Sequence, residues 1–195
     1  MVEYDSQTAL IIVDVQNDFA DPAGSLYVRG GEDVVPFVNL ERERARAAGA
    51  LVVYSQDWHP LETPHFARDG GIWPVHCVQD TWGAAFHPGL RVEQEPVIRK
   101  GTGGEDGYSA FTVRDPETGD TKPTALEGLL RERGIHRVVV AGLATDYCVK
   151  ETVIDAARLG FEPIVLEDGV RAVNLQDGDG LRALEAMRGA GAVIE

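Results

Sequence analysis

Short apolar runs rich in valine and isoleucine alternate with helical patterns along almost the whole chain, and this alternation constrains the fold more than any other feature. The runs are ALIIV (9–13), ALVVYS (50–55), PVIRK (96–100), RVVVAG (137–142), PIVLED (163–168) and AVIE (192–195). Helical patterns lie between them, at 34–48, 124–133, 147–159 and 179–190. Nearly continuous Val/Ile runs are typical of strands buried on both faces, and strands joined by helices form parallel sheets. We therefore predict a three-layer α/β/α fold.

Length and composition favour one soluble domain spanning residues 1–195. The chain has no repeat or linker, it is 44% hydrophobic and 26% charged, and its apolar stretches are too short to span a bilayer. A net charge of -14 without a Lys/Arg stripe argues against a nucleic-acid partner. The start, MVEYDSQTALIIVD, lacks the features of a signal peptide, and two cysteines cannot build a disulfide scaffold. We expect a cytoplasmic protein.

Reactive side chains follow four of the predicted strands. Asp14 ends the first strand, Asp57 and His59 follow the second, Lys100 ends the third, and Cys148 follows the VVVA run. Open parallel sheets bind ligands beyond the carboxyl ends of their strands, so these side chains are expected at one edge. Polar residues often end strands, but this combination of residue types favours an active site.

Cys148 is either a packed thiol or a nucleophile. The sequence predicts that it lies at the opening of a helix, where unpaired N–H groups lower the pKa of a thiol. A free thiol has a pKa of about 8.5, so a nucleophile also needs a base or a nearby cation. Asp14 and Lys100 are the candidates, although a lysine that stabilises the thiolate also makes the aspartate a weaker base. The GLAT segment before the cysteine is suited to an oxyanion hole.

A second group of side chains predicts a metal site. Asp57 and His59 are two residues apart, so both point to one face of an extended segment, and His65 and His76 follow in the same region. Aspartate and histidine ligands suit Zn, Fe(II), Mn or Co. The alternative is that these are loop residues bonded to the backbone.

Other residues of this region are assigned more ordinary places. We expect Cys77 to be a packed thiol and His87 to be a structural or rim residue. The aromatic rings of Phe19, Trp58 and Trp73 would normally pack in the core or loops, but near a pocket they offer flat faces to a ring-shaped ligand.

Six motifs together resemble one family. They are, in order, IIVDVQNDF, DWHP, WPVHCVQDTWGA, IRKGT, YSAF and GLATDYCVKET. In this order they resemble the nicotinamidase (pyrazinamidase) branch of the isochorismatase-like cysteine hydrolases, from about Ala9 to the last helix. The resemblance implies a six-stranded parallel sheet of order 3-2-1-4-5-6. It also implies hydrolysis of nicotinamide to nicotinate and ammonia in NAD salvage, with pyrazinamide as a surrogate substrate.

The resemblance also assigns catalytic roles. Asp14 would accept the thiol proton and return one to ammonia, Lys100 would hold the carboxylate and thiolate together, and Cys148 would form a thioester with the substrate. The N–H groups of Ala144 and Cys148 would form the oxyanion hole, beside a cis peptide bond between Leu143 and Ala144.

The same resemblance implies one divalent transition metal, zinc first, with iron or manganese as alternatives. Asp57, His59 and His76 match the ligands of the family, and His65 matches a fourth ligand found in some members. The metal would bind the ring nitrogen of the substrate. The residues that would line the ring pocket are Phe19, Trp73, Tyr108, Leu143 and Ala144. A homo-oligomer is compatible with these assignments.

Two segments depart from the expected pattern or have no role. GTGGEDG, between Lys100 and Tyr108, is richer in glycine than the resemblance predicts, and TVRDPETGDTKPT is expected to be a surface turn. Two alternative functions remain at this point: a related amidase or isochorismatase-family hydrolase acting on another small substrate, and a catalytically silent binding protein on the same scaffold.

Overall fold

The first apolar run forms strand β1 (Thr8–Val13), near the centre of the main sheet in the computed structural model, which describes residues 2–195. All six residues of β1 are buried. Ala9, Ile11 and Val13 pack into one core cluster, whereas Leu10 and Ile12 pack into the other. Because successive side chains of a strand point to opposite faces, β1 is covered on both sides, as its sequence predicts.

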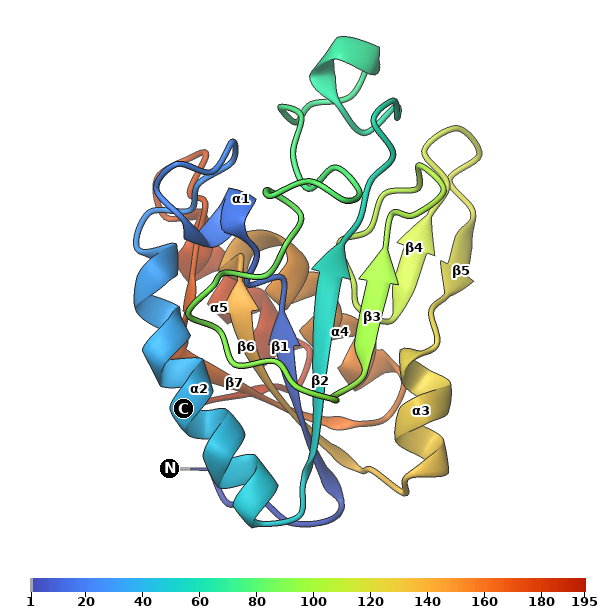
Figure 1. Ribbon diagram of the computed structural model, residues 1–195. Coiled ribbons are helices and arrows are strands. Elements are labelled where there is room, and N and C mark those ends of the chain that lie inside the picture. The colour runs from blue at the N-terminus through green and yellow to red at the C-terminus, as the bar shows by residue number, and fades with distance from the viewer. Residues whose placement is uncertain (1) are drawn as a thin grey trace.

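The main sheet has six strands, all paired in parallel (Figure 1). Besides β1 they are β2 (Leu51–Asp57), β3 (Val97–Lys100), β6 (Arg137–Leu143), β7 (Glu162–Arg171) and β8 (Val193–Ile194). Their spatial order is β3-β2-β1-β6-β7-β8. Numbered within this sheet alone, the order is the predicted 3-2-1-4-5-6.

The labels skip two numbers because a separate hairpin lies between β3 and β6. Its strands, β4 (Thr112–Arg114) and β5 (Thr121–Pro123), pair antiparallel and form a two-stranded sheet of their own. The sequence predicted only a surface turn here. β4 is half-buried at two of its three residues and β5 is exposed throughout, and three-residue strands carry too little hydrophobic alternation to predict a hairpin.

Helices cover both faces of the main sheet. They are α2 (Val34–Ala47), α3 (Leu126–Glu132), α4 (Lys150–Arg158) and α5 (Asp179–Gly189). The buried hydrophobic residues of α2 join one core cluster, and those of α3 and α4, with Leu184 and Met187 of α5, join the other. Figure 1 shows α2 on the side of the sheet opposite to α4 and α5. The three-layer prediction is confirmed. Short elements that the sequence did not predict are α1 (Asn17–Ala20), η1 (Gly31–Asp33) and η2 (Ala67–Asp69).

The helix predicted over 147–159 begins differently. Residues Thr145–Val149 (η3) form a π-helical turn, and α4 follows from Lys150. The Val149 N–H donates to the Ala144 carbonyl over 3.1 Å, which is the i to i+5 pattern of a π-helix. Cys148 therefore lies inside a widened turn that starts before the predicted helix.

Segment 58–96 joins β2 to β3 and extends beyond the carboxyl ends of the strands (Figure 1). It carries His59, His65 and His76, three of the predicted metal ligands. Among residues 2–195, no helix combines the length and apolar character needed to cross a membrane.

Candidate active site

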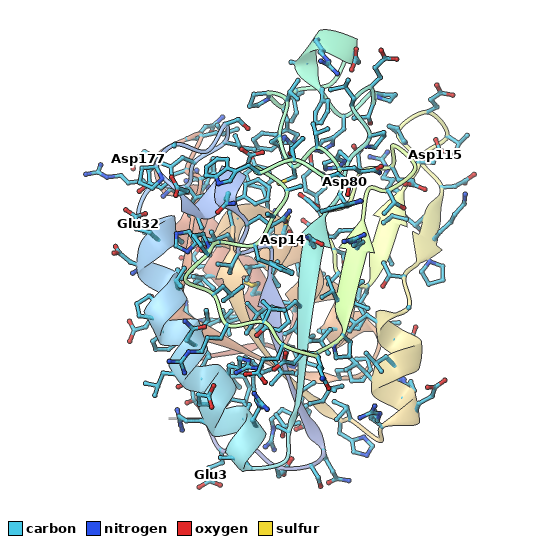
Figure 2. The ribbon with its side chains drawn as sticks, in the orientation of Figure 1. Glu3, Asp14, Glu32, Asp80, Asp115 and Asp177 are labelled. Atoms are coloured by element: carbon cyan, nitrogen blue, oxygen red, sulfur yellow. The ribbon has the colours of Figure 1, made fainter. Side chains whose placement is uncertain are left out.

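Three side chains meet at the carboxyl ends of β1, β3 and β6. Asp14 directly follows β1 (Figure 2), Lys100 is the last residue of β3, and Cys148 lies in η3. Lys100 Nζ is 2.6 Å from Asp14 Oδ2 and 3.6 Å from Cys148 Sγ. Asp14 and Lys100 are completely buried, and Cys148 is 7% exposed. The structure thus brings the three predicted catalytic residues together.

Lys100 has a second carboxylate partner. Its Nζ also contacts Asp57 Oδ1. Asp57 was predicted as a metal ligand, and the structure places one of its oxygens on the lysine and the other 3.9 Å from His59 Nε2. One buried ammonium therefore links the predicted catalytic group to the predicted metal group.

Two further side chains hold Asp14 and Asp57 in place, one through a carboxylate and one through the backbone, and neither was predicted from the sequence. Ser55 Oγ donates to Asp14 Oδ1 over 2.7 Å. Gln16 Nε2 donates to the Asp57 carbonyl, and Gln16 Oε1 accepts from the Asp57 N–H, each over 2.8 Å. The position of Ser55, two residues before Asp57 on β2, was the available signal, since such residues share a face.

The ionisation of this group corrects one expectation. Burial raises the pKa of the Cys148 thiol well above its usual range; Lys100 lowers it, but Asp14 and Asp57 raise it. One carboxylate was expected beside the lysine, and the structure places two there. Burial also raises the pKa of Asp14 to about 6, although Lys100 lowers it. Near neutral pH the resting site thus holds a protonated thiol beside an ionised Asp14, which can accept the proton.

Lys100 keeps its charge despite complete burial. Burial lowers its pKa, but Asp14 and Asp57 raise it well above the usual range. The same ammonium acts on Asp57: burial raises the pKa of that carboxyl, and Lys100 outweighs burial and brings it below its usual range. A buried charge is tolerated only when it is paired, and here the Lys100 ammonium and the two carboxylates stabilise one another's charged forms.

The segment before the nucleophile has the predicted backbone shape. The peptide bond between Leu143 and Ala144 is cis. Ala144 lines the pocket, and its carbonyl accepts from the N–H groups of Tyr147 and Val149. The Leu143 side chain is fully buried in the core and lies outside the pocket lining, unlike the expectation from the resemblance.

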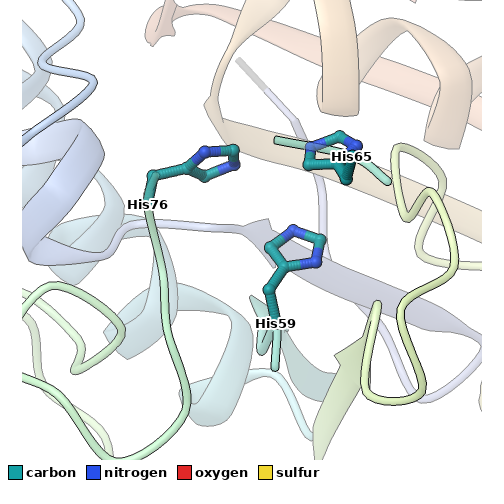
Figure 3. Close-up of side chains that lie close together, drawn as sticks. All are labelled: His59, His65 and His76. Carbon is teal, nitrogen blue, oxygen red and sulfur yellow. The ribbon is translucent and has the colours of Figure 1, made fainter. Parts of the chain in front are cut away.

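Three imidazoles form a second cluster (Figure 3), and the rings of His65 and His76 line the same pocket as Cys148. One ring nitrogen from each of His59, His65 and His76 lies within 4.8 Å of the others. The three residues are between 0% and 6% exposed. In Figure 3 the rings come from three points of the chain and face a common space. The predicted histidines are therefore brought together, with Asp57 at the edge of their cluster.

The donor atoms of this cluster fit a divalent metal. His76 Nδ1 is 2.7 Å from the Pro74 carbonyl, and His65 Nδ1 is 2.7 Å from Asp106 Oδ1, so each ring has its Nε2 left. Both ring nitrogens of His59 are buried without a hydrogen-bond partner among residues 2–195. Burial lowers the pKa of His65 and brings that of His76 to about 4, so these rings are neutral, as metal ligands must be.

Gly101 explains one glycine of the unusual GTGGEDG segment. Its φ is +74°, a left-handed conformation that favours glycine, and a Cβ atom there would come within 2.5 Å of the His59 ring. The residue after Lys100 must therefore lack a side chain for His59 to keep its place.

The thiol opens into a narrow pocket with mainly apolar walls. Phe19, Trp73, Tyr108 and Ala144, four of the predicted substrate-contacting residues, line it. Trp73 Nε1 donates to the Tyr108 hydroxyl over 2.7 Å. The sequence analysis missed Tyr147, whose ring meets Trp73 edge-on with centroids 4.8 Å apart. It also missed Leu26, Val28, Gly107 and Val173.

The residues assigned to ordinary places lie outside the pocket lining. Cys77 is completely buried, and burial raises the pKa of its thiol. The ring of His87 accepts a hydrogen bond from the Gly89 N–H. Trp58 packs against the Arg99 guanidinium, whose central carbon is 3.8 Å from the ring centroid.

The chain is similar to known proteins over almost its whole length. The isochorismatase domain model matches residues 8–195. The nicotinamidase of Escherichia coli is 39% identical over 203 residues, which cover 95% of this chain and 93% of the relative. The crystal structure of the pyrazinamidase of Pyrococcus horikoshii in complex with zinc has a TM-score of 0.87 at 38% identity, covering 97% of this chain and 98% of the other. The structure of PnC1 from L. infantum in complex with nicotinate has a TM-score of 0.89 at 40% identity, covering 100% and 95%.

Proposed function

The chain belongs to the isochorismatase family, and we infer that it is a nicotinamidase, which hydrolyses nicotinamide to nicotinate and ammonia and also accepts pyrazinamide. One observation carries this function: the buried Lys100 ammonium contacts both the Asp14 carboxylate and the Cys148 thiol, and a cluster of three imidazoles lies in the same site. A thiol, a base and a metal site around one narrow pocket with aromatic walls suit the hydrolysis of an aromatic amide.

Acylation begins with a proton transfer. Asp14 Oδ2 takes the proton of the Cys148 thiol, and Sγ attacks the carboxamide carbon of the substrate. The C–N bond then breaks, and Asp14 gives its proton to the nitrogen, which leaves as ammonia. A thioester between Cys148 and the nicotinoyl group remains.

Deacylation uses the same base. Asp14 removes a proton from water as the water oxygen attacks the thioester carbon. The C–S bond breaks, and the sulfur takes the proton from Asp14. The nicotinic acid that forms gives its carboxyl proton to solvent and leaves as nicotinate. Lys100 stays protonated throughout and offsets the negative charge that passes between Asp14 and Cys148.

The pocket orients the ring of the substrate. Phe19, Trp73 and Tyr108 offer flat apolar faces to a pyridine ring. The N–H groups of Ala144 and Cys148 are proposed to stabilise the oxyanion of the tetrahedral intermediates.

The proposed metal is zinc, held by His59, His65 and His76 with Asp57. Neutral imidazole and carboxylate ligands suit Zn²⁺, and the pyrazinamidase of similar structure was crystallised with it. When bound, the ion supplies a Lewis acid that orients and polarises the ring of the substrate. Iron and manganese use the same ligand types and are alternatives.

The same proposal gives the protein a cellular place. Converting nicotinamide to nicotinate is a step of NAD salvage, and we expect it to occur in the cytoplasm. We expect no nucleic-acid partner, and a homo-oligomer is compatible with the proposal.

The test is ammonia release from nicotinamide by the purified protein, before and after treatment with a chelator. We expect release from the untreated protein, loss after chelation, and recovery on adding Zn²⁺. Metal-bound protein that releases ammonia from another small amide but not from nicotinamide would support a related amidase instead. A silent binding protein would be supported by two results together. The protein would release ammonia from neither amide, and iodoacetamide would alkylate its Cys148 no faster than a free thiol.

A further inference from the structure

The ring of His65 is held from outside the imidazole cluster by Asp106. His65 Nδ1 is 2.7 Å from Asp106 Oδ1, and the two side chains are 5% and 19% exposed. A proton on Nδ1, donated to this carboxylate, leaves Nε2 as the ring's only free donor atom. The centroid of the His65 ring lies 4.6 Å from that of His59 and 5.3 Å from that of His76.

A second tie joins the same two segments. Thr63 Oγ1 donates to the Gly104 carbonyl over 2.9 Å, and the His65 N–H donates to Thr63 Oγ1 over 3.2 Å. The backbone and the ring of His65 are therefore both connected to the segment that contains Asp106. This double connection restricts the position of the ring more than the Asp106 contact alone.

The backbone of Asp106 is hydrogen-bonded to the β4–β5 hairpin. The Asp106 N–H donates to the Arg114 carbonyl, and the Arg114 N–H donates to the Asp106 carbonyl, each over 2.8 Å. Arg114 is the last residue of β4. The hairpin, to which the sequence assigned no role, thus fixes the backbone of the residue that contacts His65.

We propose that Asp106 is a positioning residue of the metal site: it holds His65 with Nε2 facing the ion, and the β4–β5 hairpin holds Asp106. The inference rests on the proposed metal-dependent function. It explains how His65 serves as a metal ligand in this chain, since a ring held at its far nitrogen binds a metal with less loss of freedom.

The experiment measures Zn²⁺ affinity of the metal-free protein by competition with a chromophoric chelator. Asp106→Ala is expected to weaken binding by about 10- to 100-fold, the usual effect of removing a partner of a ligating histidine. Asp106→Asn, which keeps an acceptor oxygen without the charge, should lose less. Glu105→Gln is the matched control, because the Glu105 carboxylate accepts from the Gly103 N–H of its own loop; its affinity should stay at the wild-type value.

A double variant separates positioning from a general structural effect. If Asp106 acts through His65, then His65→Ala with Asp106→Ala should bind Zn²⁺ no more weakly than His65→Ala alone. The visible absorption of bound Co²⁺ should change in the same way in both single variants. Wild-type affinity in Asp106→Ala, or losses that add in the double variant, would overturn the proposal. Asp106→Asn serves as the folded variant should the alanine variant fail to fold. Because no readout uses nicotinamide, a protein that binds Zn²⁺ as described but releases no ammonia would contradict the proposed function alone.

Discussion

The Cys148 thiol has a buried ammonium at 3.6 Å and opens into the aromatic pocket. We predict that Cys148→Ala lowers kcat for nicotinamide by about a thousandfold or more, because no other group can form the thioester. Ammonia release measures the loss, and circular dichroism checks the fold. Cys77→Ala is the matched control, since the Cys77 thiol is buried outside the pocket lining, and it should keep its activity. Turnover by Cys148→Ala would refute the nucleophile.

Asp14 should set the acid limit of activity. Burial raises the pKa of its carboxyl to about 6, so below that pH it already carries a proton and cannot accept one from the thiol. We predict that kcat/KM falls about tenfold per pH unit below pH 6.

Ser55 tests this assignment, since its hydrogen bond lowers the pKa of Asp14. In Ser55→Ala the acid limb should move to higher pH. Ser109→Ala is the control, because Ser109 is buried but its hydroxyl accepts from the Phe111 N–H instead. An acid limb unmoved in Ser55→Ala would argue against Asp14 as the base.

Strand β6 shows how an element is shaped around one residue. Its register with β7 shifts between Val140 and Gly142, and Gly142 has a φ of +116°. A Cβ atom at Gly142 would lie 2.1 Å from the Val13 carbonyl oxygen. This close approach of β6 to β1 brings the following segment, with Ala144, to the pocket.

We predict that Gly142→Ala lowers the free energy of unfolding by more than about 1 kcal/mol, because alanine meets both a strained φ and a backbone atom. Gly128→Ala is the opposite case: Gly128 lies within α3 at a negative φ with no atom near its Cβ position. It should gain about 0.4–1 kcal/mol. Urea denaturation measures both; equal effects in the two variants would contradict the steric argument.

The elements differ in how far the sequence predicts them. The long Val/Ile runs give the buried strands, whose ends are within three residues of the prediction. The β4–β5 hairpin was missed, because its strands are held by pairing and not by burial. The π-turn at Thr145–Val149 was also missed, since i to i+5 hydrogen bonding over five residues leaves no periodic pattern in the sequence.

At the scale of the whole molecule, the sequence predicted which residues meet in the site better than it predicted which of them contact one another. The residues at strand ends meet because parallel strands end at one edge, which periodicity can show. That Lys100 contacts Asp57 as well as Asp14 depends on side-chain geometry across three strands. The complete set of groups around the thiol was also hidden: burial, which outweighs Lys100, and then Asp14 and Asp57 raise the thiol pKa that was expected to be lowered.

Metal removal should affect the molecule unevenly. Segment 58–96 carries the three imidazoles, whereas β1 and β6 lie in the buried sheet. A ligand at 100 times its dissociation constant stabilises a folded protein by about 2.7 kcal/mol, so chelation should lower the melting temperature. Hydrogen exchange should rise in segment 58–96 and stay slow in β1.

His59→Ala should contain little metal and show no further change in melting temperature with chelator. Full metal content in that variant would remove His59 from the site.

Lys100 is the common counter-ion of two carboxylates, Asp14 beside the nucleophile and Asp57 at the edge of the imidazole cluster. A change at either carboxylate therefore alters the charge balance that the other one depends on. An engineer who wanted a metal-free amidase on this scaffold would have to replace Asp57 and rebalance the charge around the lysine in one step, since removing the carboxylate alone would retune the thiol that was meant to be kept.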